Sequence, residues 1–355
     1  MHLGKHIPVL LVIMLVILLQ VLLSALDKTF YMTQITMSAF YALVVVGLCL
    51  LMGYAGQVSL GHAGFFAIGG YTSAVLTTCN LMAYGSSAWM GWLRSAGMVS
   101  QRQDLYGVPV LSFSPWLAGI AALLVTALIA LLIGLSVLRL KGHYLAMATL
   151  GFGLIVYRVV LGAEVFGQAD GISNVPPFRF PAGLEINGRP AFRIESYYLA
   201  WFFVVLVMIL SINLVHSRVG RALRSIHQNE EAAHSLGVNI FRYKLSTFIL
   251  SALFAALGGI FLTHYNGSIG PSEVTVMKSV RYLAIVAVGG MANLWGALLM
   301  GILLNFLSLR GMFGSYDDAV FGAILIAIML FAPQGVLRMP SRQRMMSFFS
   351  RRSHA

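Results

Sequence analysis

Long apolar runs separated by shorter polar segments dominate the hydrophobicity pattern of this chain. Most of the runs are close to the roughly 20 residues that an α-helix needs to cross the apolar core of a bilayer. They lie at about 8–26, 34–52, 62–80, 115–138, 143–163, 197–216, 245–264, 282–308 and 319–336. The pattern therefore predicts an all-α, polytopic transmembrane helical bundle over residues 1–337, followed by a basic tail at 338–355.

Basic residues in the polar segments give the bundle an orientation. Short loops rich in Lys and Arg stay on the cytoplasmic side of a membrane, and the segment 217–244 is basic, as is the tail. We therefore expect 217–244 and both termini to be cytoplasmic. The loops 81–114 and 164–196 are then expected to lie outside.

This orientation conflicts with a single unbroken crossing through 282–308, because the next helix would leave the basic tail outside. Within that run, small residues gather between Val288 and Gly296. Irregular backbone is tolerated at membrane depth where it is buried or lines a cavity. We therefore expect a broken or re-entrant glycine-rich segment there, which gives about 9–10 membrane segments in total.

The composition indicates a membrane protein and excludes a soluble domain. Of the 355 residues, 59% are hydrophobic and 10% are charged, and the mean hydropathy is +0.86. A soluble protein carries about a quarter charged residues. The net charge of +12 follows from the basic cytoplasmic segments and at most attracts anionic lipid, so it does not indicate a nucleic-acid partner.

The first apolar run, at about 8–26, is too long for the core of a signal peptide, and we interpret it as a retained transmembrane helix.

A glycine-rich stretch from Gly53 to Tyr71 places small and polar residues at membrane depth. Small residues can let two helices approach closely, or a discontinuous helix can expose backbone groups along a substrate path. Both interpretations are open for the glycines, and the path is favoured for the polar side chains. The candidate path residues here and at the later break are Tyr54, Gln57, Ser59, His62, Tyr71, Gly289 and Gly290.

Arg158 lies inside an apolar run. A charge at membrane depth is costly enough to suggest a function, which makes Arg158 a further candidate for the path. Near a helix end, however, an arginine can extend its charged head to the interface. Both interpretations of Arg158 stay open.

The basic segment 217–244 contains the pattern of a short amphipathic helix. Apolar residues at Leu223, Ile226, Ala233 and Leu236 are spaced to share one helical face. Gly237 is a natural terminator, because glycine readily adopts the left-handed conformation that ends helices.

Such a helix can fit a groove on a cytoplasmic partner. The alternative is a helix that rests on lipid headgroups, which the acidic pair Glu230 and Glu231 disfavours. The candidate docking residues are Arg221, Arg224, Glu230, Glu231, Ala232, Ala233 and Gly237.

The chain lacks the sequence signs of an enzyme. None of its lysines lies in a glycine-rich phosphate-binding loop. Neither a metal-ligand spacing nor a nucleophile with its base is visible. We therefore expect no catalytic residue, no bound cofactor and no metal in this chain.

Three motifs resemble those of the permeases of branched-chain amino acid ABC transporters, of the high-affinity leucine, isoleucine and valine M-protein type. They are the stretch Gly53–Tyr71, the segment 220–245 and the region Gly289–Gly296, and the resemblance extends from about 35 to 336. The chain departs from the family pattern at 167–172, where one glycine replaces a pair. It departs again at Ala297, where proline is usual.

The resemblance implies a permease subunit that moves branched-chain amino acids across the bacterial inner membrane. It also implies partners: two ABC ATPase subunits that use ATP, a second homologous permease and a periplasmic substrate-binding protein. The segment 217–244 would then couple the permease to the ATPases.

Two other functions stay open. One is an ABC permease for urea or short amides. The other is an ion-coupled secondary transporter, which would call for acidic residues at membrane depth. The acidic residues considered for that role, Glu164, Glu273, Asp317 and Asp318, fall near the ends of apolar runs, which makes the ion-coupled transporter the weaker alternative.

Overall fold

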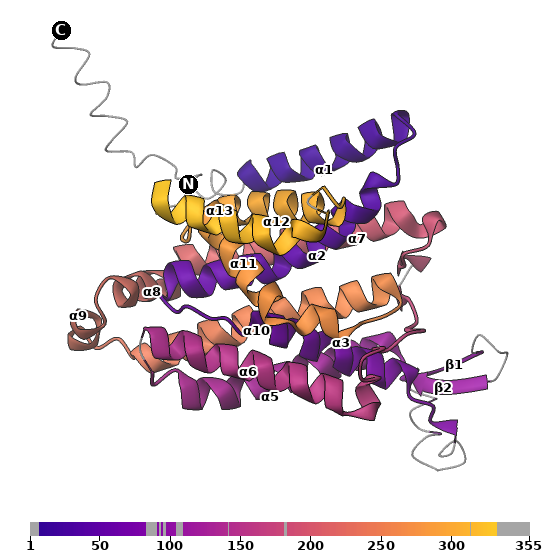
Figure 1. Ribbon diagram of the computed structural model, residues 1–355, viewed down its shortest axis with the longest axis horizontal. Helices are drawn as coiled ribbons and strands as arrows, with labels where there is room; N and C mark the ends of the chain where they lie inside the picture. Colours follow the sequence, from indigo (N-terminus) through magenta and orange to yellow (C-terminus); the bar gives the residue numbers. More distant parts are fainter. Residues whose placement is uncertain are drawn as a thin grey trace, which may run out of the picture.

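The protein is a bundle of helices with two small two-stranded sheets (Figure 1). The structure, a computed structural model, describes residues 7–82, 91, 94, 97–103, 109–140, 142–180, 183–312 and 314–331. The predicted basic tail at 338–355 lies outside the described residues. The prediction of an all-α polytopic membrane bundle is confirmed.

The element bounds follow the apolar runs. The α-helices are α1 (Ile7–Ala25), α2 (Tyr31–Cys49), α3 (His62–Thr78), α5 (Pro115–Val137), α6 (His143–Gly162), α7 (Arg193–His216), α8 (Arg218–Gln228), α9 (Glu230–Ser235), α10 (Ile240–Asn266), α11 (Val276–Gly289), α12 (Leu294–Leu309) and α13 (Asp317–Phe331). A π-helix, η2 (Leu50–Tyr54), extends α2, and the short 3₁₀ helices are η4 (Glu164–Phe166), η6 (Pro190–Phe192), η7 (Pro271–Val274) and η8 (Gly314–Tyr316). The strands are β1 (Val99–Gln103), β2 (Pro109–Phe113), β3 (Phe178–Arg179) and β4 (Glu185–Ile186).

Six of the described helical segments are long and apolar enough to cross a membrane. They are α1, α2 with η2, α5, α6, η6 with α7, and α10. The helices α3, α11 and α12 are shorter, with 17, 14 and 16 residues. Shorter helices within a membrane bundle indicate that the chain turns or unwinds inside it.

The two ends of the bundle are easily told apart in Figure 1. The helices α8 and α9 lie at one end, called here the α8–α9 end, and the antiparallel β1–β2 hairpin lies at the opposite end, the hairpin end. The expected outer loop 81–114 carries this hairpin, and the expected outer loop 164–196 carries the small β3–β4 sheet.

The core lies where α10 packs against α2 and α3, and small residues allow these helices to touch. A Cβ added at Gly258 of α10 would lie 2.6 Å from the carbonyl oxygen of Phe40, and one added at Gly69 of α3 would lie 2.5 Å from the carbonyl oxygen of Ala256. Here the close-packing interpretation of glycines at membrane depth holds.

The expected break within 282–308 is confirmed. The helix α11 ends at Gly289, the backbone turns at Gly290 with φ of +95°, and α12 begins at Leu294. The Asn293 side chain accepts a hydrogen bond from the N–H of Gly296 at 3.2 Å and so caps α12. After this turn, α12 and α13 run in opposite directions, and α13 ends toward the α8–α9 end (Figure 1).

Candidate functional site

The basic segment 217–244 forms two short helices where one was expected, so the single-helix prediction is wrong. Asn229 separates α8 from α9 with extended backbone angles, φ −157° and ψ 111°. Its side-chain oxygen accepts hydrogen bonds from the N–H groups of Glu231 at 3.0 Å and Ala232 at 3.1 Å. Asn229 is therefore a helix N-cap, which starts α9 in a new direction.

The second helix presents an apolar residue to solvent. Leu236, expected to share one helical face with Leu223, Ile226 and Ala233, is 81% exposed, whereas those three residues are buried. Gly237 ends α9 as predicted, with φ of +79°. The exposed Leu236 therefore lies directly after α9, next to the glycine turn that ends this helix.

An open groove of about 510 Å³ lies beside α9. Its walls come from the turn between α5 and α6 and from the α9–α10 connection, and it is lined by Leu138, Arg139, Glu230, His234, Gly237, Val238, Asn239, Ile240, Phe241 and Lys244. Lys244 and Glu230 form an ion pair of 2.5 Å in its lining. Glu231 and Ala232 are exposed, so α9 offers a surface next to a groove.

The helix α8 reaches the broken segment between α2 and α3. Gly56 has φ of +67°, and a Cβ there would lie 2.6 Å from Nδ1 of His227. Arg224 donates hydrogen bonds to the carbonyl oxygens of Gly220 at 3.2 Å and Val215 at 2.9 Å, which fixes α8 to the end of α7. Arg221 is exposed on α8. A displacement of α8 would therefore reach the backbone at Gly56.

The π-helix η2 holds the turn between α11 and α12. The hydroxyl of Tyr54 donates to the carbonyl oxygen of Ala292 at 2.8 Å, and the Cys49 thiol donates to that of Met291 at 3.2 Å. Gly53 permits this approach, because a Cβ there would overlap the carbonyl of Met291. The structure thus brings Tyr54 to the turn that follows Gly289 and Gly290.

A chain of buried polar groups begins α3 inside the bundle. His62 contacts Ser59 Oγ through Nδ1 at 3.0 Å and Ser251 Oγ through Nε2 at 2.7 Å. All three side chains are at most 2% exposed. Because Ser251 lies near the middle of α10, the N-terminus of α3 is at mid-depth, as expected for a discontinuous helix.

Gln57 is the most unusual residue of this break. It is 1% exposed, and neither polar atom of its side-chain amide has a hydrogen-bond partner among the described residues. A buried amide without partners is destabilising. The position therefore suits a group that meets a polar ligand or water in another state of the protein.

The two remaining path candidates lie apart from this chain of contacts. Tyr71 is buried in α3, beside Val274 and with its ring centroid 5.7 Å from that of Phe166. Arg158 is exposed on α6, close to the last residue of that helix, Gly162. The structure does not bring Arg158 together with the other candidates.

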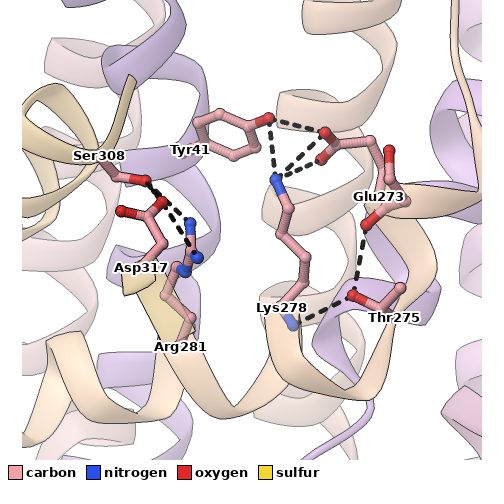
Figure 2. A network of polar contacts seen from close by, with 8 residues as sticks. Tyr41, Glu273, Thr275, Lys278, Arg281, Ser308 and Asp317 are labelled. Carbon is pink, nitrogen blue, oxygen red and sulfur yellow. Dashed lines mark hydrogen bonds and ion pairs between the residues drawn. The ribbon is translucent and has the colours of Figure 1, made fainter. Parts of the chain in front are cut away.

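A second break, which the sequence analysis missed, precedes α11 (Figure 2). The two carboxylate oxygens of Glu273 lie 3.1 and 3.2 Å from Nζ of Lys278. The Tyr41 hydroxyl donates to Glu273 at 3.0 Å and accepts from Lys278 at 3.3 Å. Glu273 does lie at the end of a run, but the fold places it against the middle of α2.

A neighbouring ion pair ties α11 to α12 and α13. Arg281 lies 3.4 Å from Asp317 and donates to the Ser308 hydroxyl at 3.0 Å, and Ser308 donates to Asp317. The ring of Phe321 lies 4.5 Å from the Arg281 guanidinium carbon. Within the ranges that the structure describes, no group of three His, Cys, Asp or Glu residues could hold a metal ion.

Comparisons with known proteins agree with this architecture. A family described as "Branched-chain amino acid transport system / permease component" matches residues 30–329. The permease protein LivM of a high-affinity branched-chain amino acid transport system is 32% identical in both Salmonella typhimurium and Escherichia coli, over 87% of this chain and 70% of that protein. LivH of Escherichia coli, a permease protein of the same kind of system, is 24% identical over 87% of this chain and 95% of that protein.

A permease of a nucleoside transporter also matches. The nucleoside ABC transporter permease protein NupC of Lactococcus lactis is 25% identical over 70% of this chain and 71% of that protein. No solved structure matches the chain.

Proposed function

Because the chain belongs to the family of branched-chain amino acid transport system permease components, we propose that it is the permease subunit of an ATP-driven importer of leucine, isoleucine and valine. The observation that carries this proposal is the 32% identity to LivM over 87% of the chain. The chain would supply the membrane path, and separate ATPase subunits would supply the energy.

The surface formed by α9 and Leu236 would dock onto an ATPase subunit. An exposed leucine beside an open groove suits insertion into an apolar pocket of a partner. The exposed acidic and small residues Glu231 and Ala232 lie on the same helix. We assign Arg221, Arg224, Glu230, Glu231, Ala232, Ala233 and Gly237 to this docking segment.

The contacts of α8 offer a route from the docking segment to the path. His227 of α8 packs against Gly56 at the start of the break, and Tyr54 of η2 holds the turn after Gly290. A movement of α8 on ATP binding would therefore displace both irregular segments together. Gln57, Ser59 and His62 would line the path that opens at the break.

The subunit would work within a larger assembly. It would lie in the bacterial inner membrane with the α8–α9 end in the cytoplasm. A second homologous permease would complete the path, two ABC ATPases would bind the two permeases, and a periplasmic substrate-binding protein would deliver the amino acid. The presence of LivM and LivH among the relatives supports a pair of different permeases.

Uptake by the reconstituted transporter tests the proposal. The complex with its ATPases, second permease and binding protein is placed in proteoliposomes, and accumulation of radiolabelled leucine, adenosine and urea is compared with and without ATP. We expect ATP-dependent accumulation of leucine only. Accumulation of adenosine or urea without leucine would assign a different substrate, and leucine uptake without ATP would contradict the ABC mechanism.

A further inference from the structure

The ion pair of Glu273 and Lys278 lies deep within the bundle. Its partner Tyr41 lies about 15 Å along α2 from Tyr31, at 1.5 Å per residue. The Tyr41 ring stacks on that of Phe66 at 5.7 Å, in the first turns of α3. The two charges are therefore level with the part of the bundle where α3 and α11 begin.

The pair is not closed off by protein. The side chains of Lys278 and Glu273 remain 21% and 19% exposed. Charged groups at membrane depth face a bundle interior or a water-filled cavity and avoid lipid. The open side of this pair would therefore face an aqueous path that the second permease completes.

Two buried hydroxyl groups near the pair have no hydrogen-bond partner among the described residues. They belong to Tyr71 and Tyr282, which are 2% and 0% exposed. Tyr71 lies in one buried cluster with Val274, the neighbour of Glu273 in the chain, and the Tyr282 ring lies 6.3 Å from that of Tyr41. Buried hydroxyls are nearly always paired, so these two hydroxyls can bind a polar ligand next to the ion pair.

We propose that Glu273 and Lys278 form a subsite for the zwitterionic head of an amino acid. Glu273 binds the α-ammonium group and Lys278 the α-carboxylate, with the tyrosine hydroxyls as further hydrogen-bond partners. The inference rests on the proposed function and names the residues of this chain that recognise the substrate. The sequence analysis assigned neither residue to the path.

Charge balance explains why a zwitterion suits this place. Glu273 and Lys278 neutralise one another when the subsite is empty, and an isolated buried charge is strongly disfavoured. A zwitterion has no net charge, so its binding replaces one ion pair with two and leaves no charge uncompensated. A ligand with a single charge would leave one group of the pair without a partner.

Binding of three related ligands to the complete permease–ATPase complex in nanodiscs tests the proposal. The ligands are leucine, leucinamide, which is a cation without a carboxylate, and 4-methylpentanoate, which is an anion without an ammonium group. Apparent Kd values come from the ligand dependence of the thermal unfolding midpoint. For the unsubstituted complex, we expect leucine to bind at least tenfold more tightly than either analogue.

Single substitutions are expected to reverse this preference in opposite directions. Lys278→Met leaves a negative subsite, and leucinamide should then bind at least tenfold more tightly than leucine. Glu273→Gln leaves a positive subsite, and 4-methylpentanoate should then bind at least tenfold more tightly than leucine. If the ion pair were purely structural, either substitution would lower the unfolding midpoint without changing the order in which the three ligands bind.

Two control variants separate a change in ligand recognition from a loss of folding. Asp317→Asn breaks the neighbouring ion pair of α11 and should leave the preference for leucine unchanged. The double variant Glu273→Lys, Lys278→Glu keeps a neutral pair and should also prefer leucine. An unchanged ligand order in both single variants, or no leucine binding by a complex that imports leucine, would overturn the subsite. Absence of leucine import by the unsubstituted complex would instead overturn the proposed function, and the subsite with it.

Discussion

Gly53 illustrates how a single residue sets the geometry where η2 meets the turn after α11. The π-helix η2 can lie against the turn after α11 because this position has no side chain beyond hydrogen. The same approach lets Tyr54 reach the carbonyl of Ala292. The close packing at Gly53 therefore leaves no space for a larger side chain.

The substitution Gly53→Ala should therefore destabilise the protein. Its Cβ would overlap the Met291 carbonyl, and overpacking of this kind costs about 1–3 kcal/mol. The thermal unfolding midpoint in detergent should fall. Gly151→Ala in α6 is the matched control, because nothing lies within 4 Å of its Cβ, and helix propensity there favours alanine by about 1 kcal/mol. Equal midpoints for the two variants would contradict the close approach.

Gln57 allows function to be separated from stability. Replacing it with leucine removes two buried polar atoms that lack partners among the described residues, so Gln57→Leu should leave the unfolding midpoint unchanged or raise it. Leucine uptake by the reconstituted complex should nevertheless fall at least tenfold, because the amide is expected to meet the substrate or water. Full uptake in this variant would remove Gln57 from the path.

Polar residues of the first break could be recognised from the sequence, whereas those of the second break could not. Ser59 and His62 interrupt a glycine-rich apolar stretch and therefore stand out. Glu273 and Lys278 lie beside the apolar run at 282–308, where an ion pair normally belongs to a surface loop. Only the fold, which packs the segment before α11 against Tyr41, places them at depth.

At the scale of elements, α9 is the helix that distinguishes the two interpretations of segment 217–244, which are docking to a partner and resting on lipid headgroups. Its N-terminus is fixed by Asn229 and its C-terminus by Gly237. Between them, the exposed residues are Glu231, the small Ala232 and Ser235, His234 and the apolar Leu236. The proposed contact with an ATPase therefore depends on a short and defined element.

Leu236→Asp should weaken this contact. An exposed leucine can be replaced without cost to folding, but a charge would not enter an apolar pocket of the partner. We expect at least tenfold less ATPase to co-purify with the variant. Leu184→Asp, at a position 41% exposed in the loop between β3 and β4, is the control and should bind as the unsubstituted chain does. Undiminished association of Leu236→Asp would exclude α9 as the docking helix.

The glycine-rich break and the basic segment 217–244 were predicted with different success for a physical reason. The break at Gly289 and Gly290 could be predicted, because glycines at depth and the requirement on the basic tail point to the same place. The division of 217–244 into two helices was missed, because the apolar spacing continues across Asn229. A useful signal was present in Asn229 followed by Glu230 and Glu231, since an N-cap residue before acidic residues is typical of a helix start.

At the scale of the whole molecule, the orientation of the bundle follows from where the basic segments lie. The α8–α9 end carries the basic segment 217–244, and α13 ends toward it. The hairpin end carries both of the expected outer loops. The distribution of charge therefore predicts a cytoplasmic α8–α9 end.

Cysteine labelling in intact cells tests this orientation. Both native cysteines, Cys49 and Cys79, are first replaced by serine. Ser235→Cys, exposed in α9, should then resist a membrane-impermeant thiol reagent, whereas Asp170→Cys, exposed between α6 and α7, should react. The opposite pattern would reverse the proposed topology.

The central claim is that docking at α9 controls the break between α2 and α3, and labelling of that break tests it most directly. Val58 is 39% exposed within the break, so Val58→Cys in the background without native cysteines can report access during the ATP cycle. In the complete complex, its labelling rate should differ at least tenfold between the ATP-bound and nucleotide-free states, and Leu236→Asp should abolish the difference. If the labelling rate of Val58→Cys were the same with and without ATP in a complex with intact ATPase activity, docking at α9 would not control the break.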